Sequence, residues 1–278
     1  MQGFHNLGNT CYANAVLKFL IHSTGTTDLL QHLKEFATHS PAAEQDAAHS
    51  FIQLIESSHS DIAPTQQALQ NFFDKLQKLP AFATRNPEGE LAFPIVGQQR
   101  DADEFLTKLS QAFALHTHYD ESIALKDHVN SFNIDAQYWT TLPPTGSNDN
   151  LQDLFDRTKP GDWNVKPGRD TKYLTVRIEN APQNAPGGLH DNKHFDFNQT
   201  VRLQTTMPNG EASMVYTLEP REVIEFRGRD NAGHYVAYVK DGQWFQHDDS
   251  RVTPIDQMPA IANVRLINFA VTRAESTH

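Results

Sequence analysis

Apolar residues in the first part of the chain recur at steps of three and four, a spacing typical of helices that bury one face. Between residues 101 and 113, for example, Phe105 and Leu109 fall on the same side of a helix. The small residues 8–10 come just before the first such segment, which indicates a helix that is entered from a tight loop. This pattern predicts helices over residues 12–20, 28–36, 43–55, 66–79 and 101–113.

The second part of the chain alternates apolar and polar residues with the period of two that strands show. Stretches rich in Pro, Gly and Asn, such as 180–188 and 228–233, separate these runs. The alternation predicts strands over residues 172–178, 195–203, 214–218, 235–239 and 264–271. We therefore expect one α+β domain over residues 1–278, with a helical lobe at 1–125 and a mainly antiparallel β lobe at 126–278.

Composition and charge exclude several classes of protein. The chain has 278 residues, of which 10% are aromatic and 21% charged, so it is expected to fold around a large core. The net charge of −11 argues against a nucleic-acid partner, because such an acidic surface repels phosphate. No apolar run reaches the length of a membrane span, and the first residues lack the pattern of a secretory signal.

The chain has a single cysteine, Cys11. It has no partner for an internal disulfide or a CxxC zinc pair, so we expect a reducing compartment. Taken alone, a lone cysteine is more often a small buried hydrophobe than a reactive group. Cys11, however, stands where a loop enters a helix, and the peptide dipoles at a helix N-terminus stabilise a thiolate. Cys11 is therefore a candidate nucleophile.

One of the 14 histidines stands out by its context. His234 ends a polar loop and opens the strand 235–239, which the turn-forming pair Asp241-Gly242 follows. The return strand 244–249 ends in two aspartates, and an acid beside an imidazole can orient it. A surface hairpin with solvated charges is the alternative for His234 alone.

The length of the turn decides which aspartate faces His234. A two-residue loop at Asp241-Gly242 places His234 opposite Asp249. A three-residue loop or a bulge shifts the pairing by one residue and brings Asp248 to the face of His234. Spacing in the sequence leaves both arrangements open.

Three motifs resemble those of the ubiquitin-specific proteases, a family of papain-like deubiquitinases. GFHNLGNTCYANAVL at residues 3–17 resembles the family's cysteine box. GHYVAY at 233–238, followed by WFQHDDSRV at 244–252, resembles its histidine box. QRDADEFL at 99–106 matches a third motif between them. The three occur in the family's order, so the resemblance is specific.

This resemblance implies a role for each matching residue. Cys11 matches the nucleophile, His234 the general base and Asp248 the acid that orients the histidine, with Asp249 as a close auxiliary group. Asn6 matches the asparagine that stabilises the oxyanion together with backbone N–H groups near Cys11.

Four further residues match positions that hold the tail of ubiquitin. Asp101 and Glu104 match acids that bind its arginine, although a plain pair of charges at a helix N-terminus is the alternative. Gly233 and Tyr235 are expected to line the channel for the terminal glycines. The loop 228–233 is placed to act as a mobile cover.

The resemblance implies a thiol deubiquitinase that hydrolyses the bond after the C-terminal glycine of ubiquitin through a thioester. Its expected partners are ubiquitin and ubiquitinated conjugates, with no cofactor, no metal and a monomeric state. The alternatives are the same chemistry on a ubiquitin-like modifier, or a non-catalytic ubiquitin-binding module. HExxH, GxSxG and GxxxxGK[ST] motifs are absent, which argues against a metallohydrolase, a serine hydrolase and a nucleotide binder.

The implied fold is papain-like, with a helical thumb and an antiparallel β palm. The chain departs from the family because it has no cysteine beyond Cys11 for a zinc site in the fingers extension. We therefore expect reduced or absent fingers, with residues 115–170 holding the body of ubiquitin instead. Such trimmed forms resemble deubiquitinase effectors that bacteria deliver into host cells, as well as divergent eukaryotic relatives. A cytoplasmic location is expected, in the host if the chain is such an effector.

Overall fold

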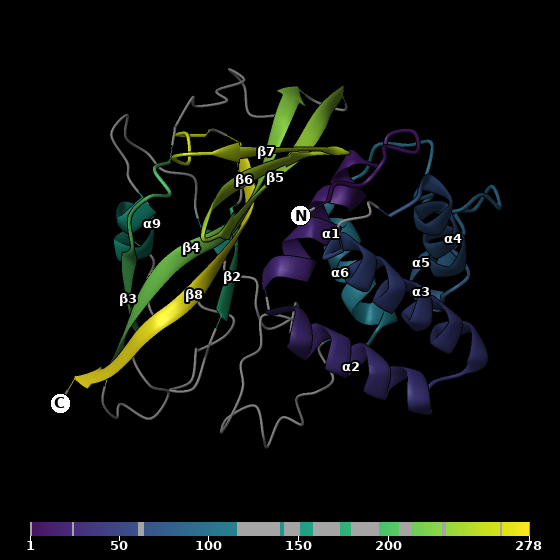
Figure 1. Ribbon diagram of the computed structural model, residues 1–278, viewed down its shortest axis with the longest axis horizontal. Helices are drawn as coiled ribbons and strands as arrows, with labels where there is room; N and C mark the ends of the chain where they lie inside the picture. The colour runs from purple at the N-terminus through teal and green to yellow at the C-terminus, as the bar shows by residue number, and fades with distance from the viewer. Residues whose placement is uncertain are drawn as a thin grey trace.

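The helices form one lobe, the thumb. The computed structural model describes residues 2–23, 25–60, 64–115, 140–141, 151–157, 173–178, 195–205, 213–229, 232–261 and 263–277. The thumb helices are α1 (Cys11–Ser23), α2 (Gly25–His39), α3 (Ala42–Ser58), α4 (Gln66–Leu76), α5 (Pro80–Ala83) and α6 (Ala102–Ala112). In Figure 1 α1 lies on the side of the thumb that faces the sheet.

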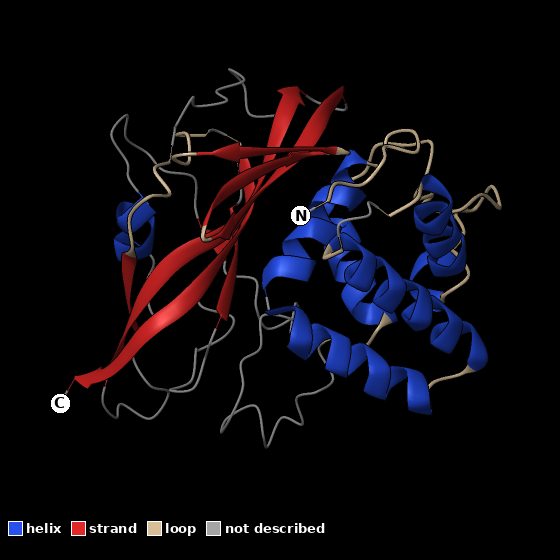
Figure 2. Ribbon diagram, in the orientation of Figure 1, coloured by secondary structure: helices blue, strands red, loops and turns tan. Residues whose placement is uncertain are grey.

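The strands form one sheet, the palm, which is antiparallel except for the pairing of β1 with β2. The strands are β1 (Thr140–Thr141), β2 (Tyr173–Ile178), β3 (Val201–Thr205), β4 (Ser213–Arg229), β5 (Ala232–Asp241), β6 (Gln243–Asp248), β7 (Arg251–Ile255) and β8 (Val264–Thr277). Their order is β1-β2-β8-β4-β5-β6-β7, and β3 pairs with β4. The short helix α9 (Leu151–Arg157) lies on the side of the sheet away from the thumb (Figure 2).

The sheet separates two hydrophobic cores, and α1 belongs to the first of them. Alternate residues of the central strands face opposite cores, because side chains along a strand point to opposite faces. On β5, Ala237 packs into the core shared with α1 and the other thumb helices, whereas Val236 and Tyr238 pack into the core on the far face. Helix α1 therefore joins the two lobes.

The expected fold class is confirmed, and the differences have local causes. Strand β4 extends well past the predicted end at residue 218, because it continues through Pro220 with a shift of register between Pro220 and Glu222. Strand β7 and helix α9 were not predicted, and the predicted strand from residue 195 begins as an isolated bridge at Phe195, with β3 starting at Val201.

Several predictions concern residues outside the described part. The lobe boundary near residue 125 lies there, as does most of the segment 115–170 that we expect to hold ubiquitin. The reduction of the fingers, which would be read in that segment, stays a prediction. In the part of the chain that the structure describes, no helix has the length and apolar character needed to cross a membrane.

A lysine is buried in the middle of α1. Lys18 is only 1% exposed, and its Nζ has no hydrogen-bond partner among the described residues but lies 4.0 Å from the centroid of the Phe4 ring. Burial lowers the pKa of Lys18 to about 7. His22, one turn further on, lies with its ring centroid 5.9 Å from that of His247 on β6, and burial also lowers the pKa of His247, to about 3. The contact of α1 with β6 is therefore lined by bases that resist protonation.

We expect Lys18→Met to stabilise the fold at pH 7 by about 1–3 kcal/mol, because it removes a buried amine without a hydrogen bond. The pKa of Lys18 is about 7 in the folded state against 10.5 for an ordinary solvated lysine, so the unfolded state binds more protons between these values. The stability of the wild type therefore rises from pH 7 towards pH 10.5, and this rise should be reduced in the variant. Urea unfolding at pH 7 and pH 10 measures both effects.

The control for this experiment is Lys34→Met, which changes an exposed lysine on α2. Lys34→Met should leave both the stability and its pH dependence close to those of the wild type. Equal stability of Lys18→Met and wild type at both pH values would contradict the prediction.

Candidate active site

A locked turn delivers Cys11 to the first position of α1. The side-chain carbonyl of Asn6 accepts hydrogen bonds from the backbone N–H groups of Gly8 (3.0 Å) and Thr10 (3.2 Å). Gly8 and Asn9 both have a positive φ, at 103° and 55°, and glycine and asparagine are the residues that adopt this conformation most readily. The chain therefore turns sharply and Cys11 begins the helix.

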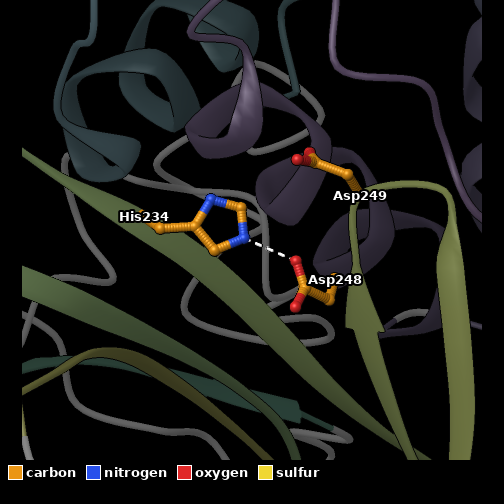
Figure 3. A group of neighbouring side chains, drawn as sticks. All are labelled: His234, Asp248 and Asp249. Carbon is orange, nitrogen blue, oxygen red and sulfur yellow. Dashed lines mark hydrogen bonds and ion pairs between the residues drawn. The ribbon is translucent and has the colours of Figure 1, made fainter.

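His234 on β5 is hydrogen-bonded to Asp248 at the end of β6. The distance from His234 Nε2 to Asp248 Oδ1 is 2.5 Å (Figure 3). The hairpin does not form the two-residue loop, because Asp241 pairs with Gln243 across Gly242 alone, which has a φ of 71°. This register brings Asp248 to the face of His234, as the resemblance implied.

The Cys11 side chain lies next to the same imidazole and raises its pKa. Because Nε2 is bonded to Asp248, the ring nitrogen left for Cys11 is Nδ1, and Figure 3 shows it pointing towards the purple helix. The interaction with Cys11 is the largest cause that raises the pKa of His234, to about 9; burial opposes it, and the bond to Asp248 adds to it. Cys11, His234 and Asp248 thus lie in one row in which the imidazole is protonated at neutral pH.

Asp249 joins the cysteine motif to the histidine motif. Its Oδ2 accepts a hydrogen bond from Asn6 Nδ2 at 2.9 Å, and its Oδ1 accepts one from Asn14 Nδ2 at 2.7 Å. Its backbone carbonyl accepts the N–H of Phe4 at 3.0 Å. An amide nitrogen has two N–H groups, so the bond to Asp249 leaves Asn6 a second donor for an oxyanion.

The candidate tail-binding residues lie beside this row. Asp101 caps α6 through Oδ1, which accepts the N–H of Asp103 at 3.0 Å, and both Asp101 and Glu104 are exposed. Tyr235 is 4% exposed, and burial raises its pKa; nearby Asp101 and Cys11 add to this rise, and the nearby backbone N–H of Ala102 opposes it. Tyr235 therefore lies between the start of α6 and the nucleophile.

Two residues at the site were missed by sequence reasoning. Gln99 was noted only as part of a motif, yet its side chain bonds both backbone groups of Gly233. Asn14, which holds Asp249, is 3% exposed on a helix that is otherwise mainly apolar on all sides. The sequence signal available for Asn14 was an amide residue within an otherwise mainly apolar helix.

Among the described residues, the side chains placed closely enough to hold a metal ion together are His234, Asp248 and Asp249. All three take part in the hydrogen bonds given above, so the arrangement is accounted for by contacts within the protein. The prediction that the chain needs no metal stays a prediction.

We expect Cys11→Ala to lower the pKa of His234 from about 9 towards 6.5, the ordinary value for histidine, because it removes the largest cause of the shift. Asp248→Ala should lower it less, since its bond is the smaller contribution. NMR titration of the His234 ring nitrogens measures both changes. Asp256→Asn, at an exposed position, is the control; a larger fall in Asp248→Ala than in Cys11→Ala would contradict the assignment.

Known proteins of two kinds resemble the chain. It is 21% identical over 319 residues to the human "Ubiquitin carboxyl-terminal hydrolase 17-like protein 10", covering 98% of this chain and 56% of that protein. The chain thus spans little more than half the length of this relative. It also matches Ubp8 in the SAGA Ubp8/Sgf11/Sus1/Sgf73 DUB module bound to ubiquitin aldehyde, at a TM-score of 0.61 and 15% identity, covering 99% of this chain and 70% of that chain. Another structure of this module gives a TM-score of 0.59, 16% identity and coverage of 99% and 68%.

The structural matches support the papain-like fold, with its helical thumb and β palm. At 15% and 16% identity they are evidence for the fold and not for the function. The family is shown by a match over nearly the whole chain. Residues 2–274 match the family described as ubiquitin carboxyl-terminal hydrolase, in agreement with the resemblance of the three motifs. The chain belongs to the ubiquitin carboxyl-terminal hydrolase family.

Proposed function

We propose that the chain is a thiol-dependent deubiquitinase that hydrolyses the bond after the C-terminal glycine of ubiquitin. The observation that carries this proposal is the row formed by Cys11 at the start of α1, His234 beside it, and Asp248 hydrogen-bonded to His234. A nucleophile, a base and an orienting acid in this order suit covalent catalysis.

In the first half of the reaction, the thiolate of Cys11 attacks the carbonyl carbon of the terminal glycine. The carbonyl electrons move to oxygen, and the second N–H of Asn6 is available to stabilise this oxyanion. The intermediate collapses to a thioester, and the leaving amine takes a proton from the His234 imidazolium. Because Asp248 holds the imidazole at Nε2, Nδ1 is the atom that donates.

In the second half, the neutral His234 removes a proton from water, and the resulting hydroxide attacks the thioester. Collapse of this intermediate returns the thiolate of Cys11 and releases the terminal carboxyl group of ubiquitin, which loses its own proton to solvent. The proton that His234 took from water stays on the imidazole, which restores the ion pair. The interaction with Cys11 that raises the pKa of His234 favours this restored state.

Burial of the nucleophile supports a slender substrate. Cys11 is 3% exposed, so a carbonyl must reach it along a narrow path, which suits an extended tail that ends in glycines. The exposed Asp101 and Glu104 are available for an arginine of the tail, and Tyr235 for its final residues. The match to a module bound to ubiquitin aldehyde is in keeping with ubiquitin as the substrate.

The direct test is reaction with ubiquitin that ends in an electrophilic warhead, read by intact mass. The wild type should gain one ubiquitin, and Cys11→Ala none, because the thiolate supplies the only bond to the probe. Probes that carry the C-terminal tails of ubiquitin-like modifiers test whether such a modifier is the substrate instead of ubiquitin. Reaction with such a probe alone would move the substrate to that modifier. An unreactive wild type whose Cys11 still accepts a small thiol reagent would favour a non-catalytic binder.

Substitutions of Asp248 and Asp249 should have different effects on the rate of hydrolysis and on its pH dependence. Asp248→Ala should lower kcat/KM by about 100- to 10,000-fold and change its pH profile, because His234 loses the group that orients and charges it. Asp249→Asn should lower kcat by up to about 100-fold and keep the pH profile, because it disturbs Asn6 and leaves His234 in place. Hydrolysis of a ubiquitin fluorogenic ester or amide between pH 5 and pH 10 measures this difference.

The matched control for the two aspartate variants is Asp256→Asn, at an exposed position, which should behave as the wild type. Identical pH profiles for Asp248→Ala and the wild type would reject Asp248 as the orienting acid.

Because the chain has a single cysteine, the proposal includes a reducing, cytoplasmic compartment.

A further inference from the structure

The side chain of Gln99 bonds both backbone groups of one residue in the opposite lobe. Gln99 Nε2 donates to the carbonyl of Gly233 at 2.8 Å, and the N–H of Gly233 donates to Gln99 Oε1 at 3.1 Å. The two residues are 134 positions apart in the sequence. Gly233 directly precedes His234, so this contact reaches the backbone next to the general base.

The contact lies where β5 has a partner strand on one side only. On one side, Gly233 and His234 pair with Gly228 and Arg227 of β4. On the other side, the pairing of β5 with β6 ends at Ala237 and His247 among the described residues. The amide of Gln99 therefore takes the place of a neighbouring strand at the start of β5, because it offers one donor and one acceptor to the same residue.

The same thumb segment contacts β5 on the far side of His234. The hydroxyl of Tyr235 lies close to the backbone N–H of Ala102, so residues 99–102 are near both neighbours of His234 in the chain. Gly233 fits this close packing because a Cβ there would lie 2.4 Å from the ring of Phe226 and 2.8 Å from the carbonyl of Arg227. The position of His234 is thus tied to the thumb, which also holds Cys11.

We propose that Gln99 is a positioning residue that fixes the start of β5 against the thumb, so that the imidazole of His234 meets the thiolate of Cys11. The inference rests on the proposed function for the identity of the reacting pair. Gln99 touches neither reacting atom in the structure; it acts through the backbone of Gly233.

Alkylation of Cys11 by iodoacetamide tests this inference without any ubiquitin. In the wild type the imidazolium of His234 activates Cys11, so its alkylation should be faster than that of free cysteine over the pH range in which His234 is protonated. Gln99→Met keeps the length of the side chain and loses both hydrogen bonds. Its rate at pH 7 should fall at least tenfold, so that its dependence on pH approaches the profile of free cysteine.

Two further variants complete the design. Gln98→Met changes the exposed neighbour, which accepts a bond from Arg100, and should keep the wild-type profile. Gln99→Asn keeps an amide that is too short to bridge both atoms, so it should show the same direction of change if Gln99→Met does not fold. Thermal unfolding checks that each variant is folded.

The outcomes distinguish the inference from the proposed function. A folded Gln99→Met or Gln99→Asn with the wild-type profile would overturn the positioning role while leaving the reacting pair intact. A wild type that reacts no faster than free cysteine at pH 7 would overturn the ion pair itself, and the positioning role with it. A shifted profile together with a lower rate towards the ubiquitin probe would support both.

Discussion

The interaction between the Cys11 side chain and His234 joins two lobes, and the rest of the site is arranged around it. Cys11 begins the helix that packs against the sheet, and His234 lies at the start of a central strand. Neither element places the pair alone, because the contact depends on how the lobes meet. Apolar packing between the sheet and α1 sets the approximate position of the two lobes, and polar contacts between the lobes determine it in detail.

These polar contacts join segments that are far apart in the sequence. On one side, the turn after β6 bonds the N-terminal segment: Asp249 holds Asn6, Asn14 and the backbone of Phe4. Gly3 fits there because a Cβ would lie 2.4 Å from the carbonyl of Asp249. The cysteine and histidine motifs are thus one structural unit, although more than 200 residues separate them in the chain.

The local sequence pattern predicted helices and strands well where apolar residues recur regularly. It did not predict the strand register or the residue roles that depend on contacts between distant segments. Helix α6 was found almost residue for residue, because its apolar positions repeat cleanly and Asp101 is an effective cap. The Asp-Gly pair suggested a two-residue turn, but the register that β6 adopts could not be read from it. Lys18 offered no sign of its burial, since that follows from α1 being covered on every side. The roles of Asn14 and Gln99 depend on partners distant in the sequence.

The turn from Asn6 to Thr10 has a consequence for the energetics of substrate binding. Its backbone is held by the Asn6 carbonyl and by residues in the left-handed region, so the donors near Cys11 are ordered before any ligand arrives. The conformational entropy of this segment is lost when the protein folds, and association with a substrate need not lose it again. Donors fixed in this way also undergo little reorganisation as charge develops on the substrate oxygen, so binding energy from the remainder of the substrate stays available to lower the barrier.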